Sequence, residues 1–128
     1  MKVLDSTFLI DAIAGEKETL PLLSGKATLL TTQICMFEVI RGLFKKKASP
    51  LKIQEVMELF EHIRVLPFDD QAVVKSAEIS AELWNRGNPI PDSDCMIAGS
   101  ALSKKIPVLV TRNVKHFNRI QGLTVETY

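Results

Sequence analysis

The sequence predicts an α/β fold, with a single domain in which a central, mostly parallel sheet of about five strands is flanked by helices. Short apolar runs rich in Val, Ile and Leu alternate along the chain with longer segments that have helical spacing of apolar residues. This alternation is typical of parallel strands joined by crossover helices. Polar and acidic residues lie at the junctions, where turns and helix caps are expected.

With 128 residues, of which 46% are hydrophobic and 24% charged, the chain is long enough for one compact domain over residues 1–128 and too short for two. Its longest apolar runs last about six residues, whereas a membrane-spanning helix needs about 20, so no membrane span is expected. The first residues lack the apolar stretch of a cleaved signal peptide, and we expect a cytoplasmic protein with Cys35 and Cys95 as free thiols. A net charge of +1 neither favours nor excludes a polyanionic partner.

Residues Lys2–Leu4 are predicted to form a short buried strand. Asp5 and Ser6 end this strand, and residues 7–15 have helical spacing up to Gly15, which stops the helix. The acidic turn at Asp5 therefore lies where a strand passes into a helix.

A second strand is predicted over residues 27–32, which form the apolar run ATLLTT. Thr32 is a suitable cap for the following helix, which carries a broad apolar face and contains Glu38. Residues 49–63 begin with a serine cap and a first-turn proline and keep an apolar stripe, which predicts another helix.

The third strand is predicted over residues 64–68, and Pro67 indicates that it is short or lies near a sheet edge. Residues 69–87 open with two aspartates and end in a glycine, which predicts a long helix. The connector of residues 88–91 contains two prolines and leads into a helix of small residues that begins at Asp92.

The fourth and fifth strands are predicted at residues 107–111 and 123–127. Ligands of parallel sheets gather outside the carboxyl ends of the strands. Asp5 directly follows the first strand, and residues 111–113 lie at the end of the fourth. Both segments should therefore open onto the same edge of the sheet.

Acidic side chains are expected to meet at this edge. The candidates are Asp5, Glu38, Asp94 with its neighbour Asp92, and the neutral Asn113. Clustered carboxylates repel one another unless a hard cation neutralises them, and carboxylate oxygens are the ligands that Mg²⁺ and Mn²⁺ prefer. Such an ion can also hold a phosphate and activate a water, so the acids predict hydrolysis of a phosphodiester.

Each acid also has a structural interpretation. Asp5 could end the strand and cap the helix after it, and Asp92 is the natural N-cap of the helix that it opens. Asp94 would gain stability from the helix dipole in any case. Glu38 could be an exposed helix residue, although apolar neighbours on both sides argue against a fully solvated face.

Four segments, taken together, resemble one known family. They are VLDSTFLID, FEVIRG, IPDSDCMIAGSAL and LVTRNVKHFNRIQGLTVET, in that order and at family-like separations across nearly the whole chain. With them the sequence resembles the PIN-domain ribonucleases, most closely the toxin subunits of VapBC-type toxin–antitoxin pairs. The resemblance implies an endoribonuclease that depends on Mg²⁺ or Mn²⁺, with Asp5, Glu38 and Asp94 as catalytic acids. Asp5 and Asp94 would be the direct metal ligands, and Glu38 would hold a metal-bound water or orient the nucleophile.

The resemblance also implies secondary contacts and contains one departure. Thr7 matches a polar site of the family that could hydrogen-bond the acids, although it could instead cap the helix. Arg112 would either contact a phosphate or form a structural ion pair with one of the acids. The family often has a fourth acid after the fourth strand, at positions that hold Asn113 and His116 here. Asn113 can still bind a metal or a water through its amide oxygen, and Asp92 could supply the missing charge.

Toxins of this family are usually homodimers whose antitoxin covers the acidic pocket. The resemblance therefore implies RNA as substrate, an antitoxin as partner and a homodimer. Apolar surfaces around Phe44, Leu51 and Leu59 are candidates for the protein contacts, unless these residues belong to the core.

Two other functions stay open on the sequence. A phosphatase would need a second acid two residues after Asp5, and Thr7 occupies that position. A catalytically weak PIN-like module that binds RNA or protein is consistent with the missing fourth acid. Metal-dependent cleavage of RNA would distinguish the endoribonuclease from this module.

Overall fold

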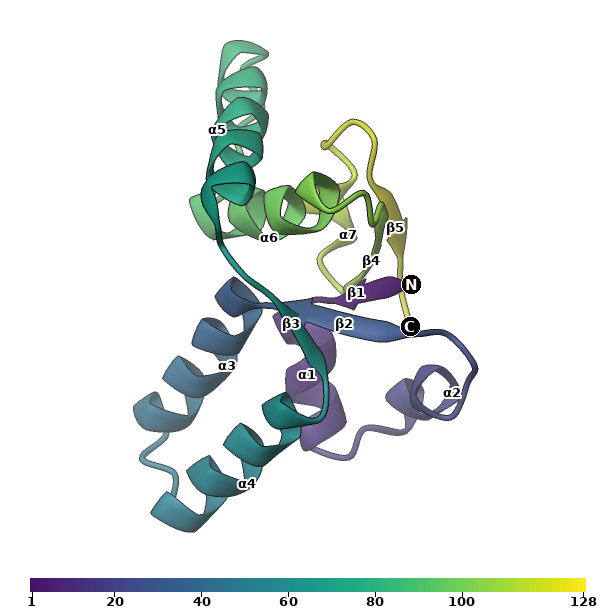
Figure 1. Ribbon diagram of the computed structural model, residues 1–128, viewed down its shortest axis with the longest axis vertical. Coiled ribbons are helices and arrows are strands. Elements are labelled where there is room, and N and C mark those ends of the chain that lie inside the picture. The colour runs from purple at the N-terminus through teal and green to yellow at the C-terminus, as the bar shows by residue number, and fades with distance from the viewer.

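A five-stranded sheet forms the centre of the computed structural model, which describes residues 1–128 (Figure 1). The strands lie in the order β3, β2, β1, β4, β5, and every neighbouring pair is parallel. All five predicted strands are confirmed, and the third one, which precedes Pro67, lies at an edge of the sheet as predicted. Their bounds are β1 Lys2–Leu4, β2 Leu29–Thr32, β3 Arg64–Leu66, β4 Val108–Val110 and β5 Thr124–Glu126.

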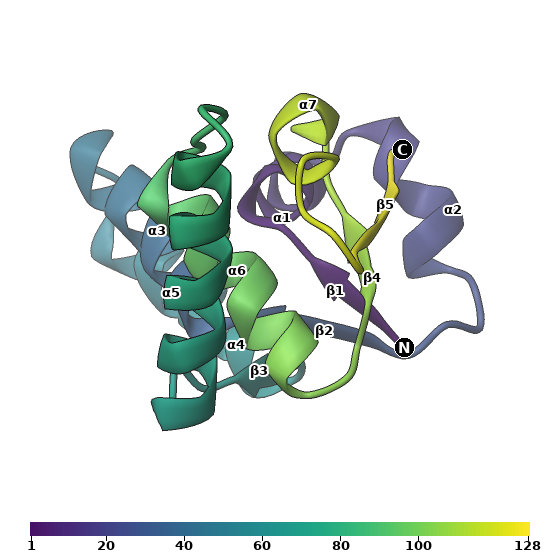
Figure 2. The ribbon, with the colours of Figure 1, turned by 90° about the horizontal axis from the view of Figure 1, so that it is seen from above.

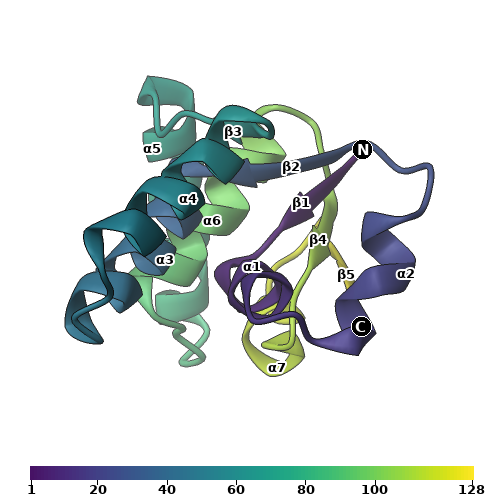
Figure 3. The ribbon, with the colours of Figure 1, turned by 90° about the horizontal axis from the view of Figure 1, so that it is seen from below.

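Helices cover both faces of the sheet. One face carries α5 (Asp70–Asn85) and α6 (Asp92–Ser103), which are seen from above in Figure 2. The other face carries α1 (Ser6–Ile13), α3 (Gln33–Lys45) and α4 (Pro50–Glu61), which are seen from below in Figure 3. The five predicted helices are therefore confirmed.

Three short helical segments were not predicted, because runs of three or four residues are too short to show a helical period. They are the 3₁₀ turn η1 (Lys17–Thr19), α2 (Leu20–Leu23) and α7 (Val114–Phe117).

Alternate residues of the central strand pack against opposite layers of helices. Val3 belongs to the larger core, which includes Ile79 of α5 and Ile97 of α6. Leu4 packs on the other face with Phe8 of α1. Since both faces are covered, consecutive residues of the central strands are buried: Val3 and Leu4 in β1, and Leu109 and Val110 in β4.

Side-chain caps fix where most of the long helices begin. The carboxylate of Asp5 accepts the backbone N–H of Ser6, and the hydroxyls of Thr32 and Ser49 cap α3 and α4 as predicted. The prediction that Asp92 caps α6 is wrong. Pro91 occupies the N-cap position in an extended conformation and no side chain caps this helix, so Asp92 is already inside the first turn.

Close packing of α5 on α6 sets the position of α6 and therefore of Asp94 in its first turn. A Cβ atom placed on Gly99 would lie 2.0 Å from the Oγ of Ser76 and 2.8 Å from its Cα. The Ser76 hydroxyl is fixed, because it donates to the carbonyl of Ala72. Only glycine allows this approach of the two helices.

The carboxyl ends of the central strands open onto one edge, as predicted. Asp5 follows β1, α3 follows β2, and Thr111 follows β4. Cys35 and Cys95 are both buried free thiols, which confirms the prediction that they do not pair. None of the helices combines the length and the apolar character that a membrane span requires.

Candidate active site

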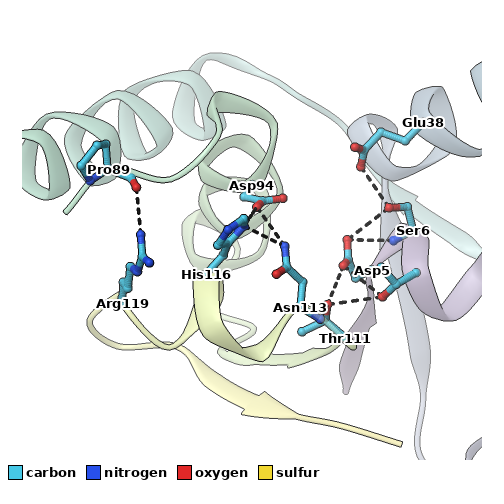
Figure 4. Close-up of polar contacts among 10 residues, drawn as sticks. Asp5, Ser6, Glu38, Pro89, Asp94, Thr111, Asn113, His116 and Arg119 are labelled. Carbon is cyan, nitrogen blue, oxygen red and sulfur yellow. Dashed lines mark hydrogen bonds and ion pairs between the residues drawn. The ribbon is translucent and has the colours of Figure 1, made fainter.

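Asp5 lies at the centre of the site, 3% exposed, directly after β1. Its Oδ2 accepts hydrogen bonds from the hydroxyls of Thr111, at 2.6 Å, and Thr7, at 3.2 Å (Figure 4). These hydroxyls in turn accept the backbone N–H groups of Asn113 and Arg112, respectively. Each hydroxyl therefore has its own proton free to donate, and together the two hydroxyls fix the orientation of the Asp5 carboxylate.

Thr7 thus contacts an acid as predicted, whereas the contact of Thr111 was not predicted. Its position at the end of β4 is the one sequence signal that could have indicated it. The capping role of Asp5 and its place in the acidic cluster coexist, because Oδ1 accepts the N–H of Ser6 at 2.8 Å while Oδ2 receives the two hydroxyls.

Glu38 extends from α3 towards the same point. The hydroxyl of Ser6 donates to its Oε1 at 3.1 Å, so one residue links Glu38 to Asp5 (Figure 4). Burial raises the pKa of Glu38 above 4.5, with smaller contributions from the charges of Asp5 and Asp94; the bond from Ser6 and the charge of Arg41 oppose this shift. Asp5 and Glu38 lie close enough for their oxygens to share one cation.

Asp94, in the first turn of α6, is 8% exposed. Its Oδ2 lies 2.9 Å from Nδ1 of His116 and 3.2 Å from Nδ2 of Asn113. Burial raises the pKa of Asp94 and the charge of Asp5 adds to this, while the hydrogen bond from His116 opposes it. Nearby, Arg119 donates to the carbonyl of Pro89 at 2.9 Å, which ties the segment after α7 to the connector before α6 (Figure 4).

Asn113 and His116 therefore both contact a carboxylate of the cluster. Asn113 does so through its amide nitrogen rather than through the amide oxygen considered from the sequence. His116 was identified from the sequence only as a replacement for an acid, and the structure brings it to Asp94 because α7 turns the chain back towards α6.

Arg112 points away from the cluster. Its Nε lies 2.6 Å from Oδ2 of Asp11, and its guanidinium stacks over the ring of Tyr128 at 4.8 Å. The Tyr128 hydroxyl donates to the same carboxylate oxygen at 2.7 Å. Of the two interpretations of Arg112, the structural ion pair is therefore the one observed, although its partner is an acid outside the cluster.

Asp92 also lies apart from the other acids. It is exposed, and it lines a hollow between α5 and α6 together with Val73 and Cys95. Asp92 and Asp94 are two residues apart in the sequence, so on a helix their side chains point to different sides. Asp92 therefore does not replace the missing fourth acid in this arrangement.

The three acids lack the basic partners that buried carboxylates usually need. Asp5 and Glu38 form no ion pair, and Asp94 is paired only with His116. Mutual repulsion and burial both disfavour this much negative charge, and a divalent cation would relieve it. The oxygen donor set fits Mg²⁺ or Mn²⁺.

Cys35 lies beneath the cluster, with its Sγ 3.9 Å from Oδ1 of Asp5. Burial, followed by the charge of Asp5, raises the pKa of the Cys35 thiol to about 12. At this pKa the thiol remains protonated near neutral pH. Since a thiol binds metals as the thiolate, Cys35 adds no ligand for a hard cation.

Comparison with known proteins identifies the family of this chain. The family model of the PIN domain matches residues 2–123. The tRNA(fMet)-specific endonuclease VapC of Salmonella typhimurium is 35% identical over 97 residues, which cover 76% of this chain and 73% of that protein. Ribonuclease VapC1 of Methanocaldococcus jannaschii is 31% identical over 127 residues, covering 98% and 85% of the two chains.

Solved structures agree as well. The DNA-bound VapBC structure from Salmonella typhimurium superposes with a TM-score of 0.87 and 31% identity, over 98% of this chain and 96% of that one. VapBC-1 from nontypeable Haemophilus influenzae gives a TM-score of 0.82 and 26% identity with the same coverage. The family match over nearly the whole chain, together with the shared fold, shows that this chain belongs to the PIN domain family.

Proposed function

We propose that this protein is an endoribonuclease that depends on a divalent metal ion, Mg²⁺ or Mn²⁺, and hydrolyses phosphodiester bonds of RNA. The observation that carries the proposal is the clustering of three carboxylates, the buried Asp5 and Asp94 and the half-buried Glu38, at the carboxyl edge of the sheet without a Lys or Arg partner. Of these, Asp5 and Glu38 lie close enough to share one cation, and the charge of Asp5 acts on both of the other acids. The ribonuclease names of its relatives support the same activity.

Asp5 and Asp94 are the proposed metal ligands, and Glu38 is the third acid of the site. When bound, the ion would polarise the phosphate and make a water more acidic. The protein supplies orientation: Thr7 and Thr111 fix Asp5, and Asn113 and His116 contact one oxygen of Asp94, which leaves Oδ1 for the ion.

Glu38 is suited to orient the attacking water and to accept its proton. It is only partly buried and is held by one hydroxyl, that of Ser6, at Oε1, so Oε2 can face the substrate. Its raised pKa brings a carboxylate closer to the working pH, where a general base is more effective.

The protein is further proposed to be the toxin of a toxin–antitoxin pair that acts in the cytoplasm as a homodimer. The related structures named above are VapBC complexes. Phe44, Leu51 and Leu59 are exposed rather than part of the core, which favours them as contacts for an antitoxin or a second copy of the chain. A basic side chain of the antitoxin could occupy the acidic site.

Cleavage of RNA by purified protein in Mg²⁺, Mn²⁺ or EDTA tests the proposal. We expect cleavage with at least one of the metals, none in EDTA, and loss of activity in Asp5→Asn and Asp94→Asn with an unchanged circular dichroism spectrum. Inactivity of the pure protein with both metals would favour the catalytically weak binding module instead. A phosphatase finds no support, because Thr7 is engaged with Asp5 and offers no second acid.

A further inference from the structure

Three side chains from separate parts of the chain meet at one carboxylate outside the acidic cluster. The Oδ2 atom of Asp11, on α1, accepts from Nε of Arg112 at 2.6 Å and from the hydroxyl of Tyr128 at 2.7 Å. The guanidinium of Arg112 also stacks over the Tyr128 ring. This ring makes an edge-to-face contact with Phe8, a fully buried residue of α1. We call Asp11, Arg112 and Tyr128 the Asp11 anchor, which joins α1 to the segments after β4 and β5.

The Asp11 anchor keeps its charges around neutral pH. Hydrogen bonds from Tyr128 and Arg112 lower the pKa of Asp11, so its carboxylate is ionised. Burial, followed by the bond to Asp11, raises the pKa of Tyr128 to about 12, and the bond to Asp11 raises the pKa of Arg112. A carboxylate therefore faces a cation and a neutral hydroxyl donor, and such charge-assisted bonds are among the stronger ones in proteins.

The segment after β4, residues 111–116, contacts both proposed metal ligands. Thr111 donates to Asp5 at 2.6 Å, and Nδ1 of His116 lies 2.9 Å from Oδ2 of Asp94 (Figure 4). A shift of this segment would therefore move the contacts of two acids at once.

Little regular structure holds this segment in place, because β4 ends before it and α7 is four residues long. The backbone N–H of Arg112 donates to the hydroxyl of Thr7 at 3.1 Å. The next N–H, that of Asn113, donates to the hydroxyl of Thr111 at 2.9 Å. The side chain of Arg112 adds a second contact to α1 at Asp11, one turn after Thr7. Arg112 thus binds α1 at two points, through its backbone and through its side chain.

We propose that the Asp11 anchor positions residues 111–116 for catalysis, by holding them against α1 at the distance at which they reach both metal ligands. Its three side chains act through Thr111 and His116 and do not themselves contact the reacting atoms. The inference rests on the proposed function and adds to it positioning residues outside the acidic cluster. A displacement of about 1 Å far from the reacting groups can cost about 100-fold in rate, so such a contact can affect the reaction.

Kinetics of RNA cleavage by variants of the full-length protein test the inference. Arg112→Ala and Asp11→Ala each remove the ion pair, and the double variant removes both partners. Tyr128→Phe removes the hydroxyl but keeps the ring, its packing on Phe8 and the stacking of the guanidinium. This variant keeps the packing of the fold, so it can be measured even where an alanine variant is unstable.

Lys104→Ala is the matched control. It breaks the ion pair between Lys104 and Asp69, whose N–O distance of 2.6 Å equals that between Arg112 and Asp11. Lys104 follows the last residue of α6, about 15 Å along the helix from Asp94. Its loss should therefore lower the melting temperature without changing the kinetics.

We expect Arg112→Ala and Asp11→Ala each to lower kcat about tenfold at saturating metal, with KM within about twofold of the wild type. Binding of a single-stranded RNA oligonucleotide in EDTA should also stay within about twofold. The double variant should lose no more than either single variant, because both substitutions break the same contact. Tyr128→Phe removes one hydrogen bond and should lower kcat about threefold.

Three kinetic results would overturn the inference. An unchanged kcat with a fall in melting temperature like that of Lys104→Ala would mean that the ion pair only stabilises the fold. Weaker binding of RNA in EDTA by Arg112→Ala, with kcat unchanged, would mean that Arg112 contacts the substrate instead. Losses of kcat that multiply in the double variant would mean that Asp11 and Arg112 act independently.

Hydrogen–deuterium exchange gives a measurement that needs no activity. In the metal-free protein, Arg112→Ala and Asp11→Ala should speed up exchange of the amides of residues 111–117, whereas Lys104→Ala should leave it as in the wild type. Unchanged exchange of this segment in both variants would overturn the inference even if the wild type cleaves RNA. A wild type that cleaves no RNA with either metal would instead refute the proposed function, and the exchange would still decide whether the Asp11 anchor positions the segment.

Discussion

His116 and Asp94 are joined by a contact of 2.9 Å between Nδ1 and Oδ2, and Asn113 reaches the same oxygen at 3.2 Å. One oxygen of Asp94 is thus contacted by two side-chain nitrogens from the segment after β4. The other oxygen remains for a cation. The segment after β4 therefore contacts an acid of the cluster through a histidine and an asparagine.

Removal of this contact should weaken metal binding. His116→Ala takes away a donor that opposes the raised pKa of Asp94, so we expect the affinity for Mn²⁺ to fall about tenfold, as for other residues that orient metal ligands. Isothermal titration calorimetry measures the affinity. Lys115→Ala, at an exposed neighbouring position, is the control, and equal affinities of the two variants would contradict the prediction.

Asp5→Asn separates the metal role of Asp5 from its capping role. Asn can keep the N-cap bond through its amide oxygen, but its amide nitrogen cannot accept from Thr7 and Thr111, so the melting temperature in EDTA should fall modestly while the protein stays folded. Added Mn²⁺ should raise the melting temperature of the wild type but not of the variant, and cleavage of RNA should fall at least about 100-fold. A metal-induced shift that survives in Asp5→Asn would argue against Asp5 as a ligand.

The hydroxyl of Thr111 should matter for both stability and activity. Thr111→Val leaves the backbone N–H of Asn113 without its acceptor and Asp5 without its closest donor, which we expect to cost about 1–3 kcal/mol of unfolding free energy. Thr111→Ser keeps the hydroxyl and should restore most of the loss. Urea denaturation and RNA cleavage measure the two effects, and equal behaviour of Val and Ser would contradict the assigned role.

Glu38 should make the free energy of unfolding of the metal-free protein depend on pH in a defined direction. Burial raises the pKa of Glu38 above 4.5, so the folded state binds this proton more readily than the unfolded state. The stability that this group contributes is present below pH 4.5 and is lost as the pH rises through the raised pKa. Glu38→Gln should therefore be more stable than the wild type in EDTA at pH 7, and the difference should shrink as the pH falls towards 4.5. A difference that is constant with pH, in urea denaturation, would contradict this.

The contact between α5 and α6 predicts opposite effects of the same substitution at two helical glycines. Gly99→Ala brings a Cβ within 2.0 Å of Ser76 and should destabilise the protein by about 1–3 kcal/mol. Gly42→Ala on α3 meets nothing within 4 Å and should stabilise it by up to about 1 kcal/mol through helix propensity. Thermal denaturation of both variants checks the pair, and a stable Gly99→Ala would mean that the helices can move apart.

The five strands, the five long helices and the edge that carries the site could be predicted from the sequence. These features follow from local patterns: runs of apolar residues, capping residues, and the rule that parallel strands end on one side. Asp5 could be placed at that edge because it directly follows a strand, and the same reasoning applied to Thr111, Arg112 and Asn113.

The partners of individual side chains were decided only by the tertiary structure. Arg112 pairs with Asp11, 101 positions away, and stacks on Tyr128, while Asp92 turns towards α5 and His116 reaches Asp94. Such contacts depend on ångström-scale distances between elements that are far apart in the chain. Sequence periodicity sets which face of an element is buried, but only the packing of helices and strands against one another sets which polar atoms meet.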